Sequence, residues 1–350
     1  MNQPKSTAAK WRLAGAVVVA CATAGTLLAQ QAPTSQRAGQ VIGSRSFSPM
    51  VEDVDAAMKL YAALGLTIPD PGKGTTYPWD EEAWHYDLHG GQAPKSQMRF
   101  TYANVPGAVP PAKPLLIEPV EHRGIDRKAR TPLPQNPGST TLVVVVRDLD
   151  LAVSKLPEEL QQPVRRASYY GKAARATTVA VPGMHLVELL QPDPVPETTA
   201  PAGANTIGAW VRVSVTDLDK TLALYRERFG IPFRVSTPTD GELGGLVGAK
   251  GAQLRMATGT LPGTNMTLEF LEVTGVSRTP LDARIQDPGA ARLQLSVQNL
   301  ETTLETLSAA GPSTVVSTGG RIIQQPGSRV VVVSDLNGLY LVLTDRPKAP

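Results

Sequence analysis

The chain has 350 residues, long enough for two domains with separate hydrophobic cores. Its formal net charge is +3, but residues 1–29 hold three of the 34 Lys and Arg and no Asp or Glu, so the remainder has 31 basic residues against 31 acidic ones. This balance lacks the basic excess of a nucleic-acid-binding protein, and we expect no nucleic-acid partner. The single cysteine, Cys21, excludes an intramolecular disulfide.

Residues 1–29 are typical of a secretory signal peptide. Three basic residues precede an apolar run that ends at Ala29, and a polar stretch follows. We therefore expect a secreted or periplasmic protein that is cleaved after Ala29. Two alternatives stay open: the apolar run remains as an uncleaved membrane anchor, or Cys21, in the sequence Val-Val-Ala-Cys, is lipidated. A membrane association would arise only in these two ways.

A recurring unit follows the polar and predicted flexible segment 30–44. In the first copy, Val54, Met58 and Tyr61 recur at helical spacing after a short strand, and Gly65 ends the helix. Further copies begin near residues 141, 210 and 292. Each is interpreted as one strand, one amphipathic helix and three more strands.

The third copy has the clearest pattern. Val211, Val213 and Val215 are apolar, whereas Trp210 and Arg212 alternate with them, which is the period of a half-buried strand. Thr216 and Asp217 then offer side chains that could cap a helix, and Gly230 ends the helix.

The four copies also form a longer repeat of about 155 residues, which indicates duplication. The sequence QNPGST at 135–140 corresponds to QDPGAA at 286–291. We predict a first domain at 45–192, a Pro-rich linker at 193–205 and a second domain at 206–346. The predicted fold class is α+β, with two tandem domains, each of two paired βαβββ units that form an open curved barrel around a cavity.

The stretches VRVSVTDLDKTLALYRERFGIPF and VSDLNGLYLVL resemble the first and last strands of the vicinal oxygen chelate superfamily, which includes glyoxalases, bleomycin resistance proteins and extradiol dioxygenases. The resemblance covers residues 45–345. It implies a divalent metal in the cavity, held by a histidine seven residues before the aspartate of the first turn and by a glutamate of each last strand.

The sequence departs from this ligand pattern. The positions that correspond to the histidine are Ser46, Thr141, Trp210 and Arg292. The positions that correspond to the glutamate are Glu118, Glu188, Glu269 and Val342. Since no histidine is present, we expect no metal and no other cofactor.

In the second half, we expect Arg292 to point into the same cavity as Glu269 and to pair with it in a fork. Nearby residues of the predicted site are Trp210, Arg212, Gln294 and Tyr340. One interpretation is a structural ion pair that fills a former metal site. The other is a clamp for an anion or carboxylate, in which the aromatic rings form stacking walls.

In the first half, Glu118 and Glu188 are expected to face each other across the cavity. They would form an acid–base pair, bind a hard cation, or only meet solvent and arginines. If a metal binds, His85 and His89 are the histidines that would join them, although both lie in a predicted surface loop. His122 is expected at the surface, and His185 on the helix side of its strand.

Three functions remain open. The leading hypothesis is an exported tandem glyoxalase-like protein that binds a small molecule, with an anion among the candidates, in a cavity without the usual metal ligands. The alternative is a metal-dependent lyase, isomerase or dioxygenase with non-standard ligands in the first domain. The third is an assembly scaffold. Whether the protein is an enzyme, which ligand it takes and its oligomeric state do not follow from the sequence.

Overall fold

A computed structural model describes residues 40–68, 78–79, 96–109, 114–169, 172–236, 251–263, 266–310, 314–315, 317, 322–325 and 327–345. Residues Arg37–Pro350 belong to one compact unit. The predicted signal peptide, His85 and His89 lie outside the described residues. In the described part of the chain, no helix has the length and apolar character needed to cross a membrane.

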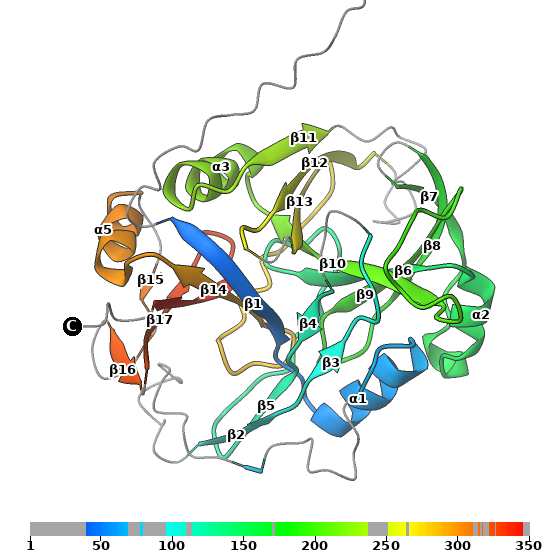
Figure 1. The fold of residues 1–350 in the computed structure, drawn as a ribbon, viewed down its shortest axis with the longest axis horizontal. Helices are drawn as coiled ribbons and strands as arrows, with labels where there is room; N and C mark the ends of the chain where they lie inside the picture. The colour runs from blue at the N-terminus through cyan, green and yellow to red at the C-terminus, as the bar shows by residue number, and fades with distance from the viewer. Residues whose placement is uncertain are drawn as a thin grey trace, which may run out of the picture. The chain divides into compact units, whose positions relative to one another are not determined.

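Four units follow one another along the chain (Figure 1). Unit 1 comprises β1 (Val41–Pro49), α1 (Val54–Ala63), β2 (Gln97–Phe100), β3 (Ala103–Asn104), β4 (Leu116–Ile117) and β5 (Val120–Arg123). Unit 2 comprises β6 (Thr140–Val146), α2 (Leu149–Ser154), the 3-10 turn η4 (Glu158–Leu160), β7 (Arg165–Tyr169), β8 (Lys172–Val179) and β9 (Leu186–Pro192).

Unit 3 comprises β10 (Thr206–Val215), α3 (Leu218–Ala223) with its π-helical continuation η5 (Leu224–Arg228), β11 (Phe233–Ser236), β12 (Gln253–Thr260) and β13 (Thr267–Thr274). Unit 4 comprises β14 (Ala291–Val297), α5 (Leu300–Ala310), β15 (Thr314–Val315), β16 (Ile323–Gln325), β17 (Ser328–Ser334) and β18 (Tyr340–Asp345). The predicted order of strand, helix and strands is confirmed. The predicted flexible segment 30–44 extends too far, because β1 begins at Val41, which pairs with Val297.

The two large sheets join units that are not consecutive. Sheet A has the order β15-β17-β18-β14-β1-β4-β3, with β16 on β17, and so combines unit 4 with unit 1. Sheet C has the order β11-β12-β13-β10-β6-β9-β8-β7 and combines unit 3 with unit 2. In each sheet the two first strands pair antiparallel, β1 with β14 and β10 with β6. Two bodies of paired units are present as predicted, but the expectation that consecutive units pair is wrong, and segment 193–205 connects two strands of sheet C.

The chain crosses between the sheets twice, at 124–139 and at 275–290. Each crossing ends in a Pro-Gly turn whose glycine has a positive φ, 85° at Gly138 and 97° at Gly289. The amide of Gly138 donates to Ser214 on sheet C, and that of Gly289 donates to Met50 at the end of β1. The buried Asp287 of the second crossing accepts hydrogen bonds from residues 128 and 130 of the first. The two crossings are therefore joined to each other.

The helices and the inner faces lie on opposite sides of each sheet. The large hydrophobic core contains Val211, Val213 and Val215 of β10 together with helical residues such as Leu218 and Tyr61. The alternate residues of the same strands belong to separate clusters. We call this second side of each sheet its inner face, and it is the face on which the sequence predicted the site.

The α-helices α1, α2, α3 and α5 of the described residues are held at their N-termini by the same arrangement. A cap residue, Asp53, Asp148, Asp217 or Asn299, accepts a hydrogen bond from the first turn. A pair of residues directly opposite each other on two strands then supports the helix: Arg99 and Glu121, Arg175 and Gln191, Arg255 and Glu272, Arg329 and Asp345. The arginine binds an acidic residue of the first turn, and its opposite residue accepts the first helical amide. This fourfold repeat supports the duplication predicted from the sequence.

Candidate functional site

The predicted site residues fall into two groups on different sheets. Trp210, Arg212 and Glu269 lie on the inner face of sheet C, where β10 pairs with β13. Arg292, Gln294 and Tyr340 lie on the inner face of sheet A, where β14 pairs with β18. The structure therefore divides the single predicted site into two.

On sheet C, a buried guanidinium joins two carboxylates. Nη1 of Arg212 donates to Glu188 at 3.1 Å, and its Nε donates to Glu269. Arg165 also donates to Glu188. The side chains of Arg212, Glu188 and Glu269 are at most 6% exposed. Two positive charges thus meet two negative charges, so the cluster is neutral as a whole and each carboxylate has an ionic partner.

The two carboxyl groups differ in their pKa. Burial by itself raises the pKa of Glu188, but the charges of Arg212 and Arg165 outweigh burial and bring that pKa below its usual value. Burial raises the pKa of Glu269 above its usual value, and the charge and hydrogen bond of Arg212 only partly oppose it. A second arginine at Glu188 accounts for this difference.

The rest of this inner face is apolar and covered. Val143, Val145, Leu190 and neighbouring alanines form a cluster with Trp210. Val109 and Ala200, which come from two connecting segments, pack against this cluster. The two segments are bonded to each other, since the amide of residue 199 donates to the carbonyl of residue 108. Residues of the two connecting segments therefore pack against the apolar cluster on the inner face of sheet C.

The predicted fork between Arg292 and Glu269 is wrong. The register of β10 and β13 places Arg212 directly opposite Glu269, whereas Arg292 lies on β14 in sheet A. The arginine that binds Glu269 on sheet C is Arg212, which comes two residues after Trp210, the position counted from the family pattern. Its location on the inner face could be read from the alternation of β10.

The predicted pairing of Glu118 with Glu188 is also wrong. Glu118 follows β4 in sheet A, and Glu188 lies on β9 in sheet C, because units 1 and 2 belong to different sheets. Both residues are buried, as expected of residues on an inner face. They form neither the predicted acid–base pair nor a shared cation site.

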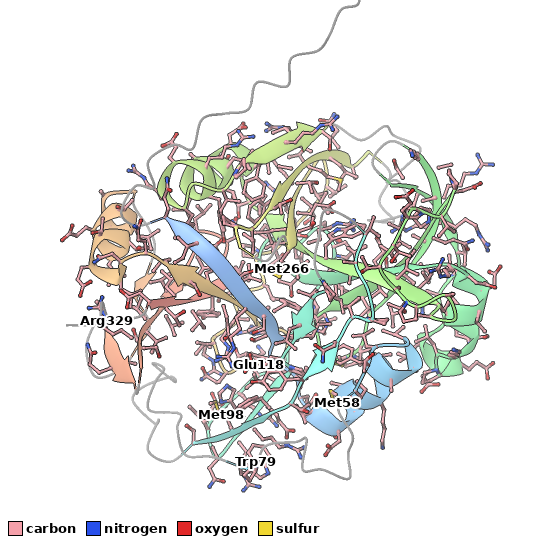
Figure 2. The ribbon with its side chains drawn as sticks, viewed as in Figure 1. Met58, Trp79, Met98, Glu118, Met266 and Arg329 are labelled. Atoms are coloured by element: carbon pink, nitrogen blue, oxygen red, sulfur yellow. The ribbon has the colours of Figure 1, made fainter. Side chains whose placement is uncertain are left out.

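On sheet A, Glu118 is bound by neutral donors. Its Oε2 accepts hydrogen bonds from Ser46 at 2.9 Å, from Ser48 at 3.1 Å and from the Gln294 side-chain amide. Figure 2 shows Glu118 next to β1 and β4. Three polar side chains of two units therefore hold this carboxylate without a cationic partner among these bonds.

Arg292 lies on the same inner face, between Ser48 on β1 and Tyr340 on β18. It is 2% exposed. The surrounding cluster is apolar and includes Met50, Met98, Val120, Val332 and Val342. The phenol of Tyr340 donates to the carbonyl of Ala283 at 3.0 Å. Sheet A thus combines a buried cation, a fixed tyrosine and apolar side chains.

His122 is buried rather than at the surface as predicted. It is 1% exposed and lies on β5, opposite Met98 of β2 and on the same face as Val120. Both of its ring nitrogens lack a hydrogen-bond partner in the described part of the chain. Burial and the charges of Arg292 and Arg127 lower the pKa of His122 to about 3, so the ring is neutral. The alternation Glu118, Val120, His122 was the sequence signal that indicated this location.

His185 lies on the helix side of its sheet, as predicted. Its ring contacts Phe47 edge-on, and its Nε2 is 3.4 Å from the hydroxyl of Tyr61 on α1. Burial lowers the pKa of His185 to about 3. This histidine is therefore part of the core and remote from the two inner faces.

The described residues do not provide a divalent metal with the donor set that the resemblance implies. The carboxylates of Glu188 and Glu269 bind the guanidinium of Arg212, and Glu118 binds two hydroxyls and an amide. No group of three His, Cys, Asp or Glu with metal-binding geometry is present among them. First-row metals favour imidazole and free carboxylate ligands, so these positions are unsuited to them. The expectation of no metal stays a prediction.

Comparison by sequence finds no matching family model and no matching curated protein. By structure, the chain is similar to glyoxalase I from Zea mays, with a TM-score of 0.54, 14% identity, and coverage of 87% of this chain and 92% of that chain. For a mutant of the maize enzyme, the TM-score is 0.52 at 12% identity, and the match covers 87% of this chain and 92% of that chain. A glyoxalase family protein from Bacillus cereus gives 0.34 at 15% identity, and covers 39% of this chain and 90% of that chain. At these identities the likeness to the maize enzyme concerns the fold.

Proposed function

The chain has the vicinal oxygen chelate fold, and we propose that it binds a small anionic molecule on the inner face of sheet A. The guanidinium of Arg292 receives the negative group, Gln294 lies beside it, and Tyr340 with the neighbouring apolar side chains contacts the rest of the ligand. The observation that supports this proposal is a buried cation among apolar residues at the position where related folds are expected to hold a metal.

The contrast between the two sheets favours sheet A. On sheet C the cation of Arg212 is bound by Glu188 and Glu269, and a ligand carboxylate would have to displace one of these buried partners. On sheet A the carboxylate of Glu118 is held by serine and glutamine donors instead. We therefore assign Arg212, Glu269 and Trp210 a structural role and keep Arg292, Gln294 and Tyr340 as binding residues.

Matched pairs of small ligands test the proposal. Benzoate and 3-methylbutanoate are compared with their neutral amides by isothermal titration and thermal unfolding. A carboxylate at 100 times its Kd stabilises the folded protein by about 2.7 kcal/mol. We expect stabilisation by the carboxylates, at least tenfold weaker binding of the amides, and loss of carboxylate binding in Arg292→Met.

The matched control is Arg165→Met, which removes a guanidinium from the inner face of the other sheet. It should bind the carboxylates as the wild type does. If no carboxylate binds the wild type, or if Arg165→Met loses binding while Arg292→Met retains it, the proposed site is wrong. Circular dichroism spectra and unfolding curves of both variants establish that they are folded.

The alternative of a metal-dependent enzyme in the first domain is not favoured. It requires Glu118 and Glu188 to converge, and they lie on different sheets.

We also propose that the protein is exported, which the basic and apolar pattern of residues 1–29 supports. Fractionation of expressing bacterial cells followed by N-terminal sequencing tests this: a start near residue 30 in the periplasm or medium supports it, and an intact cytoplasmic chain contradicts it.

A further inference from the structure

His122 is a buried polar group that the proposed function does not yet use. Both of its ring nitrogens are without a hydrogen-bond partner in the described part of the chain, and the side chain is 1% exposed. An unsatisfied buried donor or acceptor destabilises the folded protein. A histidine that serves only to fill space would be replaced by leucine or phenylalanine without this cost.

The imidazole faces the region around Arg292. Val120, on the same face of β5, belongs to the cluster that contains Met50 and Tyr340, and Met98 lies opposite His122 on β2. Arg292 is close enough for its charge to lower the pKa of His122. The cation and the unpartnered imidazole therefore belong to one region.

A neutral imidazole presents one N–H donor and one nitrogen acceptor. Burial, together with the charges of Arg292 and Arg127, lowers the pKa of His122 and keeps the ring neutral, so it does not compete for the anionic group of a ligand. A hydroxyl group both donates and accepts hydrogen bonds, and it is the smallest ligand group that matches either nitrogen. A purely apolar ligand would leave both nitrogens unsatisfied.

We propose that the ligand of sheet A is a hydroxycarboxylate with an apolar body, in which Arg292 binds the carboxylate and His122 binds the hydroxyl. This inference rests on the proposed function and adds the class of ligand. Sites built to bond a hydroxyl discriminate strongly against the analogue that lacks it, because their polar groups are then left unpaired. His122 would thus determine specificity, whereas Arg292 provides affinity for the charge.

The test uses benzoate and the three monohydroxybenzoates, which place the hydroxyl at different distances from the carboxylate. We expect at least one hydroxybenzoate to bind the wild type ten times more tightly than benzoate. In His122→Phe that gain should disappear while benzoate affinity is retained. In Arg292→Met the binding of all four probes should be lost.

Ring ¹⁵N spectra of histidine-labelled wild-type protein provide a second readout, the ligand-induced shift of the His122 ring signals. This readout is measured on the wild type, so it does not require that a variant binds ligand. The chain has four histidines, and the missing signals of His122→Phe or His122→Gln assign those of His122. The preferred hydroxybenzoate should shift the His122 ring signals, and benzoate should shift them less.

The outcomes separate the two proposals. If none of the four probes binds the wild type, the anion site and this inference both fail. If benzoate binds but no hydroxyl improves affinity, or if the gain persists in His122→Phe, only the inference about His122 is overturned. Unchanged His122 signals with the tightest probe would also overturn it, and a buried water would then be the partner of the ring.

Discussion

At the scale of single residues, Arg212 is the side chain on which the inner face of sheet C depends. It binds Glu188 of unit 2 and Glu269 of unit 3, and so joins the two units across the sheet. A buried ion pair is not in itself a strong source of stability, but removing one partner leaves an uncompensated buried charge. In this cluster the loss of Arg212 would leave two buried carboxylates near each other, with Arg165 on Glu188 alone.

We predict that Arg212→Met lowers the free energy of unfolding by about 3–5 kcal/mol. Since the two carboxylates would then have raised pKa values, the deficit relative to wild type should narrow as the pH falls from about 7 to about 5. Urea denaturation at several pH values measures this. The added substitutions Glu188→Gln and Glu269→Gln should recover part of the stability. A variant as stable as wild type at all pH values would contradict the structural role of Arg212.

Both buried histidines make the fold sensitive to acid. The pKa of His122 and that of His185 are lowered to about 3, whereas unfolded histidine titrates near 6.5. The unfolded chain therefore binds protons that the folded chain excludes, and stability is lost as the pH falls from about 6.5 towards 3. The charged and titratable groups that face the two rings are Arg292 and Arg127 at His122 and Tyr61 at His185.

At about pH 5 each histidine should contribute a loss of about 2 kcal/mol in the free energy of unfolding. His185→Phe should halve the difference between stability at about pH 7.5 and at about pH 5, and the double variant with His122→Phe should remove most of it. Chemical denaturation at both pH values checks this. Equal pH dependence of the wild type and the double variant would show that other groups cause the acid sensitivity.

At the scale of elements, the arrangement at the helix N-termini differs between units in a way that predicts stability. In unit 4, Arg329 binds Glu301 and the buried Asp345, and Figure 2 shows Arg329 beside α5. In unit 2, Gln191 replaces the carboxylate, and Arg175 binds the exposed Asp150 at the first turn. The arginine of unit 4 is therefore partly buried and pairs with a buried carboxylate. The equivalent arginine of unit 2 is exposed and pairs with an exposed carboxylate.

We predict that Arg329→Met lowers the free energy of unfolding by about 1–3 kcal/mol, because the charge-assisted hydrogen bonds to a buried carboxylate are lost. Arg175→Met is the matched control at the equivalent position, and it should leave the denaturation midpoint unchanged. Equal losses in the two variants, measured by urea denaturation, would contradict the distinction drawn between the units.

The helices and strands were more predictable from the sequence than the pairing of strands between units. The alternation of β10, the cap at Asp217 and the ends of the helices at Gly65 and Gly230 are local signals, and the structure has them where they were expected. The choice of partner for a first strand is not local, because all four first strands are apolar on one face. Sequence order favoured consecutive units, whereas the Pro-Gly crossings carry the chain to the other sheet.

The wrong pairing of units also made part of the predicted site wrong. Glu118, Glu188 and Glu269 were correctly expected on inner faces, since alternation along one strand decides that. Which arginine meets which glutamate depends on the pairing between strands, and so the predicted partner of Glu269 was wrong. The burial of His122 was missed because the alternation was followed only as far as Glu118, whereas it continues beyond Pro119 into β5.

At the scale of the whole molecule, each sheet needs both halves of the chain. Sheet A pairs β1 with β14, and sheet C pairs β6 with β10. A cut within 193–205 would leave every first strand without its antiparallel partner. Fragments 30–192 and 206–350 should therefore show no cooperative unfolding alone, and should purify together and regain it when they are co-expressed. A separately stable fragment would contradict the observed pairing of units.

We propose that Arg292 on sheet A receives the anionic group of a ligand, whereas Arg212 on sheet C binds Glu188 and Glu269. A crystal structure of the protein grown with benzoate tests this most directly. We expect the benzoate carboxylate beside Arg292 on sheet A, with Arg212 still bound to Glu188 and Glu269. A metal ion between those two glutamates, or benzoate beside Arg212 instead of Arg292, would contradict the account.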